Sequence, residues 1–270
     1  MRVVVHLSDL HFGRVNPAIL APLEQFVRQI QPTLVAVSGD LTQRAKTKQF
    51  LAAREFLRSL PFPQIVVPGN HDVPLRNPFN RFVSGLTYYR DYISEDLQPS
   101  FVDDEIAVVG VNTARALTWK DGRINRRQLE GLRRSFESVS SDHIKVVVTH
   151  HPFDLPAGAE GHVVGRSRLA INTLADCRVD MLLAGHFHIA DIGYTAKRYH
   201  LPGYSALIVS SGTSTSTRGR GQPNSLNVIK IESPHITIDR YTWRPETNLF
   251  DLLSSEAFER TSDGWIRLPA

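Results

Sequence analysis

The sequence has a single cysteine, Cys177, among its 270 residues, so no disulfide can form within the chain, as is usual for proteins of a reducing cytoplasm. We interpret Cys177 as a small buried apolar residue rather than a reactive thiol. The sequence also lacks any stretch approaching the roughly 20 apolar residues that a membrane span requires. No signal peptide can be read after Met1, because a strand-like segment follows at once. We therefore expect a cytoplasmic protein without a membrane span.

A large excess of charge of one sign is also missing. Lys and Arg total 31 against 27 Asp and Glu, which gives a net charge of +4. The arginines are scattered, apart from pairs at 126–127 and 133–134 and "RGR" at 218–220. A nucleic-acid binder usually concentrates its basic residues on one face. The composition therefore disfavours nucleic acid as a partner and is compatible with a small anionic substrate.

Short apolar runs rich in Val and Ile recur along the chain, and their length is typical of buried strands. They lie at 3–8, 33–39, 64–69, 106–112, 145–150, 180–186 and 205–212. Apolar residues at helical spacing predict helices at 17–30, 45–60, 125–136 and 167–177, with Asn125 and Ser167 as possible N-caps. This alternation predicts an α/β fold with mixed sheets, as one domain over residues 1–270. The final third lacks helical patterns, and about 225–243 should form an antiparallel hairpin.

The polar residues that end these runs are a biased set of Asp, Asn and His. They are Asp9 and His11 in "SDLHFG", Asp40 in "GDLT", Asn70, His71 and Asp72 in "GNHD", His150 in "THHP", and His186 and His188 in "GHFH". One such residue after a strand is more often a cap or a turn former. Ligands of open α/β sheets, however, bind beyond the carboxyl ends of the strands. Five such segments together therefore indicate a metal site.

The chemistry of this set suits divalent ions. Carboxylate, amide and imidazole ligands accept Mn, Fe or Zn. The pairs D-x-H and H-x-H would place both of their side chains on one face of an extended segment, so that each pair could chelate. No cysteine lies nearby, which disfavours a structural zinc site. Glycines before Asp40, Asn70 and His186 would allow sharp turns and a close approach of the backbone.

The order D-x-H, G-D, G-N-H-D, H, G-H-x-H, complete from Asp9 to His188, resembles the signature of the calcineurin-like metallophosphoesterase superfamily. Within it, "HLSDLHFG", the compact size and "SGTSTSTRGRGQPNSLNVI" are most similar to bacterial class III 3′,5′-cyclic nucleotide phosphodiesterases. The resemblance implies a four-layer α/β/β/α sandwich with two mixed β-sheets. It also implies two divalent metal ions at one end of the sandwich.

The resemblance further implies a role for each residue of the signature. The first ion would be held by Asp9, His11 and His188, and the second by Asn70, His150 and His186. Asp40 would bridge the two ions, and His71 would reach the substrate, with Asp72 orienting its ring. Two such ions can share a hydroxide that attacks phosphorus, while His71 protonates the leaving oxygen.

The substrate must be selected by the loops at 73–104, 151–166 and 187–224. Our first hypothesis is a phosphodiesterase acting on 3′,5′-cyclic nucleotides. The alternatives are a glycerophosphodiesterase, a nucleotidase, a lipid-A-pathway pyrophosphatase, or a binding scaffold that has lost catalysis. Candidate substrate residues are Asn112, Thr113, His151, Arg218 and Arg220, for which turn or surface roles are the competing explanations. A homo-oligomer is also possible.

The adjacent His150 and His151 should have different roles. Consecutive strand side chains point to opposite faces, and Pro152 favours an extended conformation at His151. With His150 assigned to the metal by the resemblance, we predict that His151 is not a ligand. It would lie beside the ligands or the substrate, or else at the surface.

Overall fold

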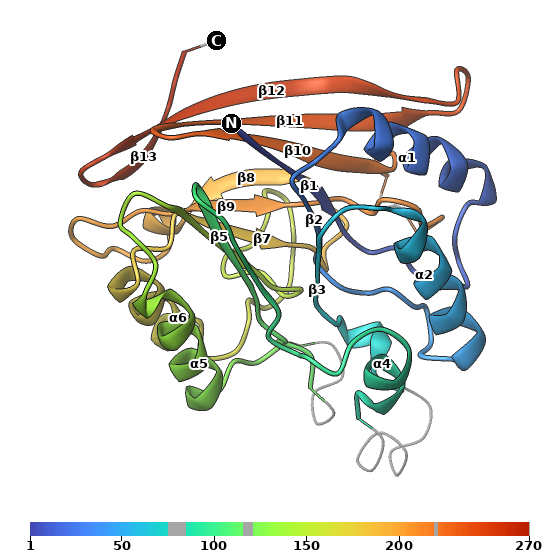
Figure 1. The fold of residues 1–270 in the computed structure, drawn as a ribbon, viewed down its shortest axis with the longest axis horizontal. Helices are drawn as coiled ribbons and strands as arrows, with labels where there is room; N and C mark the ends of the chain where they lie inside the picture. Colours follow the sequence, from blue (N-terminus) through green and yellow to red (C-terminus); the bar gives the residue numbers. More distant parts are fainter. Residues whose placement is uncertain (75–84, 116–120, 219–220, 270) are drawn as a thin grey trace.

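The computed structural model describes residues 1–74, 85–115, 121–218 and 221–269, and contains two β-sheets that lie face to face (Figure 1). The first sheet has the strand order β13-β12-β11-β10-β1-β2-β3. Its strands are β1 (Arg2–Leu7), β2 (Leu34–Val37), β3 (Gln64–Val66), β10 (Ser225–Glu232), β11 (His235–Arg244), β12 (Leu249–Thr261) and β13 (Gly264–Arg267). The first three are parallel, and the last four form an antiparallel extension next to β1.

The second sheet has the strand order β4-β5-β6-β7-β9-β8. Its strands are β4 (Ser100–Val102), β5 (Ile106–Gly110), β6 (Ile144–Val148), β7 (Met181–Ala184), β8 (Asp191–Tyr194) and β9 (Leu207–Ser210). The four central strands are parallel, whereas β4 and β8 are antiparallel edges. Both sheets are therefore mixed, as the sequence predicted.

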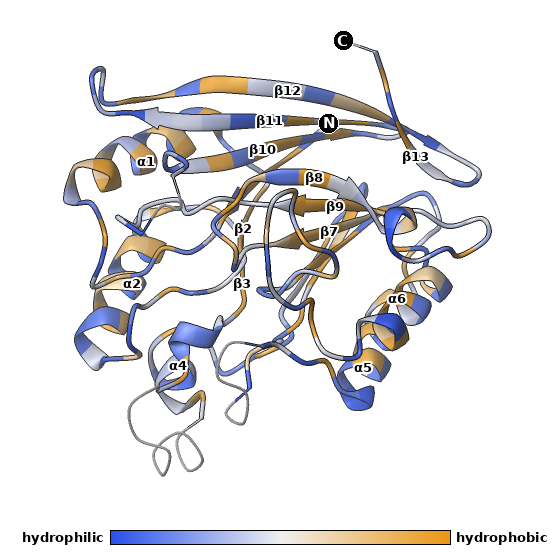
Figure 2. Cartoon of the chain, turned by 180° about the vertical axis from the view of Figure 1, so that it is seen from behind, coloured by the Kyte–Doolittle hydropathy of each residue, from blue (hydrophilic) through white to orange (hydrophobic). Residues whose placement is uncertain are grey.

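Helices cover the outer faces of the two sheets. The first sheet is covered by α1 (Pro17–Ile30) and α2 (Thr47–Ser59), and the second by α5 (Arg126–Glu137) and α6 (Ser167–Asp176) (Figure 1). Short helices α4 (Thr87–Tyr92), η1 (Asn70–Asp72) and η2 (Thr195–Lys197) lie in the connections. In Figure 2 the strands β7 and β9 are mostly orange and apolar, whereas the helices carry both orange and blue segments, consistent with burial of one face of each helix. Separate apolar clusters fill the two helix–sheet layers and the space between the sheets, so the predicted four-layer sandwich is confirmed.

Local sequence explains some helix ends and not others. Asn125 caps α5 as predicted, because its side chain accepts a hydrogen bond from the Gln128 N–H. The prediction for Ser167 was wrong: the N-cap of α6 is Arg166, in a left-handed conformation with φ 66°, and Ser167 is the first helical residue. Strands β12 and β13, which follow the expected hairpin of β10 and β11, were not anticipated.

The strand directions position the site. Because β1, β2 and β3 are parallel, as are β5, β6 and β7, the carboxyl ends of each set meet at one edge of their sheet. The loops after these strands carry the Asp, Asn and His residues selected from the sequence. Among the described residues, no helix combines the length and the apolar character that crossing a membrane would require.

Candidate metal centre

The metal-ligand candidates lie just beyond the strand ends, and their backbone there is unusual. Five of them have positive φ angles: Asp9 (53°), His11 (49°), Asp40 (53°), His186 (76°) and His188 (58°). The left-handed region is unfavourable for residues with a β-carbon, and such conformations concentrate at functional sites. The expectation that D-x-H and H-x-H are extended segments was therefore wrong. Tight turns after the strands aim these side chains instead.

The first group of ligand atoms comes from Asp9, His11 and His188. The Nε2 atoms of the two histidines are 3.1 Å apart, and His188 Nε2 is 3.1 Å from Asp9 Oδ1. His188 Nδ1 lies 2.9 Å from the backbone carbonyl of Arg218. Since a carbonyl only accepts, Nδ1 carries a proton, and Nε2 is the ring atom that faces Asp9 and His11.

The second group comes from Asn70, His150 and His186. Asn70 Oδ1 is 3.1 Å from His150 Nε2 and 3.0 Å from His186 Nδ1. His150 Nδ1 lies 2.8 Å from the carbonyl of Ser38, which again places the proton on Nδ1 and leaves Nε2 as the inward-facing atom. The backbone carbonyls thus orient one ring in each group.

Asp40 lies between the two groups. Its Oδ1 is 3.4 Å from His150 Nε2 in the second group, and its Oδ2 is 3.7 Å from His11 Nε2 in the first. The His71 N–H donates to Asp40 Oδ1 at 2.8 Å, which fixes the carboxylate. One oxygen of Asp40 therefore faces each group.

His150 and Asp40 shift each other's pKa in opposite directions. Burial opposes charge on His150, but the attraction of Asp40 outweighs burial and raises the pKa of His150 to about 9. Burial alone would raise the pKa of Asp40, yet the charge of His150 beside it lowers that pKa below its usual range. Asp9 Oδ1 is fully buried and makes no hydrogen bond with any described residue. Carboxylate oxygens and imidazole nitrogens that converge in a buried site are the environment that a cation satisfies, so the residues fit divalent metal ions.

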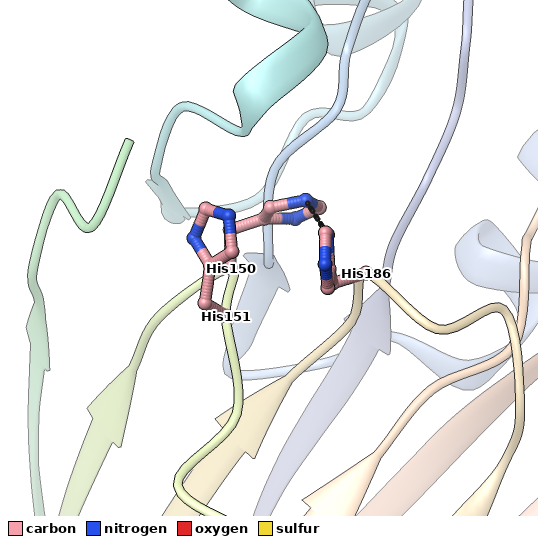
Figure 3. Close-up of side chains that lie close together, drawn as sticks. All are labelled: His150, His151 and His186. Atoms are coloured by element: carbon pink, nitrogen blue, oxygen red, sulfur yellow. Dashed lines mark hydrogen bonds between the residues drawn. The ribbon is translucent and has the colours of Figure 1, made fainter. Parts of the chain in front are cut away.

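His151 lies inside the site rather than at the surface. Its exposed fraction is 1%, so the surface alternative was wrong. Its Nδ1 is 2.8 Å from Thr113 Oγ1, and its ring centroid is 4.5 Å from that of His186. Figure 3 shows His150, His151 and His186 gathered together, with the contact between His150 and His186 dashed. Ring nitrogens of all three lie within 4.8 Å of one another, so the exclusion of His151 as a ligand stays a prediction.

His71 is oriented by a residue that sequence reasoning missed. Its Nδ1 lies 2.9 Å from the backbone carbonyl of Gln43, a buried residue three positions after Asp40. The prediction that Asp72 orients this ring was wrong. The Asp72 carboxylate accepts hydrogen bonds from the N–H groups of Leu41, Thr42 and Gly69. Asp72 thus holds the loop after β2 against the loop after β3.

The remaining candidates divide between the site and its supports. Thr113 contacts His151. Asn112 Oδ1 instead accepts from the Ala114 N–H at 2.8 Å, so this side chain stabilises the turn in which it lies. Arg218 Nη1 lies 3.2 Å from His71 Nε2, so the structure places this arginine at the site. Arg220 lies outside the described residues.

A cavity of about 530 Å³ opens over the two groups. It is lined by Asp40, Asn70, His71, Asp121, Glu160, Gly161, His162, His186, Phe187, His188 and Arg218. Asp121, Glu160, His162 and Phe187 were not selected from the sequence, because isolated loop residues carry no pattern that separates them from solvated ones. A larger cavity of about 730 Å³ lies between α5 and the turn after β12 and contains none of the candidate ligands. We take the smaller cavity as the functional one, because the ligand atoms line it.

Known proteins are similar to this chain in sequence and in fold. A family profile described as calcineurin-like phosphoesterase matches residues 2–190. "Glycerophosphodiester phosphodiesterase GpdQ" of Enterobacter lignolyticus is 30% identical over 178 residues, which are 58% of this chain and 58% of that protein. "3′,5′-cyclic adenosine monophosphate phosphodiesterase CpdA" of Escherichia coli K12 is 28% identical over 201 residues, 68% of this chain and 69% of that protein. The match to GpdQ thus spans little more than half of that relative.

Solved structures are similar over nearly the whole chain. The purple acid phosphatase PPD1 of yellow lupin has a TM-score of 0.69 at 13% identity, covering 95% of this chain and 53% of that one. GAP50 of Plasmodium has a TM-score of 0.57 at 13% identity, covering 94% and 87%. At such identities the likeness concerns the fold alone. The family profile, by contrast, covers well over half of the chain and includes every candidate ligand, so this protein belongs to the calcineurin-like phosphoesterase family.

Proposed function

We propose that this protein is a phosphodiesterase that depends on two divalent metal ions and hydrolyses 3′,5′-cyclic nucleotides. The observation that carries the proposal is the pair of ligand groups with one Asp40 oxygen facing each, at the floor of a cavity that His71 also lines. The named activity of the relative CpdA supports the cyclic-nucleotide substrate.

The first group would hold one ion through Asp9, His11 and His188, and the second group another through Asn70, His150 and His186, with Asp40 shared. Bound there, Mn, Fe or Zn would supply Lewis acidity, lowering the pKa of coordinated water and offsetting phosphoryl charge. His151, supported by Thr113, would lie beside the second ion and constrain the ring of His186.

His71 would act on the leaving group. Its Nδ1 proton is held by the Gln43 carbonyl, so Nε2 is the atom available to the cavity. In hydrolysis the oxygen of water bonds to phosphorus and the water gives up a proton to solvent, the bond from phosphorus to the leaving oxygen breaks, and a proton from Nε2 of the imidazolium passes to that oxygen. Imidazole suits this role because its charge changes near neutral pH.

The second candidate is glycerophosphodiester hydrolysis, favoured by the likeness to GpdQ. Both substrates are phosphate diesters, so the same ligand groups and His71 serve either one. The loops around the cavity, including Asp121, Glu160 and Phe187, would then decide between them.

A substrate panel tests the proposal. The protein, loaded in turn with Mn, Fe or Zn, is assayed on 3′,5′-cyclic AMP, glycerophosphocholine, AMP, a nucleoside diphosphate sugar and bis(p-nitrophenyl) phosphate. We expect the highest kcat/KM on the cyclic nucleotide. A higher value on glycerophosphocholine would favour the second candidate, and a highest value on AMP or the pyrophosphate would indicate a nucleotidase or a pyrophosphatase. No hydrolysis with any metal would indicate a binding scaffold and refute the proposal.

A further inference from the structure

The segment that ends at Arg218 is fixed to the loop that carries Asp9 and His11. Thr213 Oγ1 donates to the Asp9 carbonyl at 2.7 Å, and Thr215 Oγ1 donates to the Leu10 carbonyl at 2.6 Å. The carbonyl of Arg218 in turn accepts from His188 Nδ1 at 2.9 Å. The backbone at Arg218 is therefore held at the metal centre by hydrogen bonds on several sides.

The side chain of Arg218 reaches the atom of His71 that faces the cavity. Its Nη1 is 3.2 Å from His71 Nε2 and 3.4 Å from Gln43 Oε1. Because the Gln43 carbonyl holds the proton of His71 on Nδ1, Nε2 of the neutral ring accepts from the guanidinium. Gln43 thus contacts both partners, with its backbone carbonyl on His71 and its side chain on Arg218.

We propose that Arg218 is a catalytic residue that donates a second hydrogen bond to the leaving oxygen, and that Gln43 is the positioning residue that holds it there. The inference rests on the proposed hydrolysis. A leaving oxygen within hydrogen-bond distance of His71 Nε2 enters the space next to Nη1, because these nitrogens are 3.2 Å apart. When Nε2 of His71 carries a proton it no longer accepts from the guanidinium, which is then free to donate to a leaving oxygen that gains negative charge.

His71 and Arg218 would stabilise the leaving oxygen in different ways. As the bond between phosphorus and the leaving oxygen breaks, the imidazolium of His71 transfers its Nε2 proton, and Arg218 only donates a hydrogen bond and keeps its proton. A guanidinium remains charged at every pH of interest, so its contribution does not depend on proton transfer. It therefore matters most for basic leaving groups such as alkoxides, and least for p-nitrophenolate, which leaves readily without help.

The test is a leaving-group series of methyl aryl phosphates, from 4-nitrophenyl through phenyl to 4-methoxyphenyl, with a methyl alkyl phosphate at the basic end. We expect Arg218→Gln to lose about 100-fold in kcat on the most basic leaving group, the usual effect of removing one such donor, and less than about 10-fold on 4-nitrophenolate. Gln43→Leu should lose kcat with the same dependence on the leaving group, but by a smaller factor. Gln43→Glu keeps an acceptor oxygen for Arg218 and should therefore have the kcat of the parent protein. Added guanidinium ion should rescue Arg218→Gly.

The controls separate this role from a structural one. Arg58→Gln, at an exposed arginine on α2 with a side chain 68% exposed, should match the parent protein across the series. Metal content and melting temperature of the Arg218 variants should also match the parent, which excludes loss of the fold. If the Arg218 variants lose kcat equally on every leaving group, or do not lose it, the proposed role of Arg218 is wrong. The proposed phosphodiester hydrolysis would not be affected by that result. An inactive parent protein would overturn both proposals.

Discussion

His150 and His151 are neighbours in the chain, yet their rings meet at 84° with centroids 4.8 Å apart. Nε2 of His150 faces Asn70 and Asp40, whereas Nδ1 of His151 makes a hydrogen bond with the hydroxyl of Thr113. The backbone at a strand end has separated two identical side chains, and each is fully enclosed. This geometry makes their substitutions distinguishable.

We expect His150→Ala to lose the ion of the second group and His151→Ala to retain both ions. The reason is that Nε2 of His150 converges with the other ligand atoms of its group, whereas the expected role of His151 is to pack against the ring of His186. Inductively coupled plasma mass spectrometry on purified variants measures the metal content. Loss of an ion from His151→Ala would show that this residue is a ligand after all.

Asp40→Ala should lose both ions, because each of its oxygens faces a different ligand group. The same metal analysis, with activity measured in parallel, tests this. Asp104→Ala, at an exposed acid in the turn between β4 and β5, is the matched control and should keep full metal content. An Asp40 variant that retains both ions and its activity would refute the bridging role.

For His71→Ala we expect full metal content and a fall in kcat of about 10²–10⁴, the usual contribution of a positioned proton donor. The ring is held by Gln43 and lines the cavity, and only its backbone N–H bonds to Asp40. Exposed His200 provides the control substitution to Ala. Should the His71 variant be purified without metal, its assignment as a residue outside the ligand set would be wrong.

Much of this architecture could be predicted from the sequence, because its signals are local. Buried strands and amphipathic helices follow from periodicity, and the ligand residues stand where apolar runs end. The roles of Gln43 and Arg218 could not be predicted, since they depend on a contact between residues 175 positions apart. The same holds for Asp72, whose partners Leu41 and Thr42 belong to the loop of another strand. Strand β12 was missed because much of its surface is exposed, including Leu249, Leu252 and Leu253, so no buried pattern marks it.

Gly69→Ala should disrupt the metal centre through packing alone. The φ angle of Gly69 is −102°, which any residue can adopt, so conformational freedom does not explain the glycine. A β-carbon there would overlap Oδ1 and the backbone nitrogen of Asp40. We expect reduced metal content and a loss of about 1–3 kcal/mol in the free energy of unfolding, as for other overpacked sites.

Urea titration and metal analysis together measure both effects in Gly69→Ala. Gly193→Ala in β8 is the matched control, because open space surrounds the corresponding position there, and it should leave metal content unchanged. Normal metal content in the Gly69 variant would show that Asp40 can move aside without losing its ligand geometry.

His6 should make the folded protein sensitive to acid. It is fully buried on β1, with Nε2 2.9 Å from Ser38 Oγ, and burial, opposed only in part by Asp9, lowers the pKa of His6 to about 3. In the unfolded chain its pKa is about 6.5. Between these values the unfolded chain binds a proton that the folded protein does not. The stabilisation is therefore complete above pH 6.5 and is lost as the pH falls toward 3, at up to about 1.4 kcal/mol per pH unit.

The slope of unfolding free energy against pH, from urea titrations between pH 7 and pH 4.5, measures this contribution. We expect His6→Asn to have a shallower slope than the parent protein, whatever its stability at neutral pH, because asparagine does not titrate. Protonation of the metal ligands adds the same slope to both proteins, so the difference isolates His6. Equal slopes for the parent and His6→Asn would mean that His6 takes up its proton in the folded state.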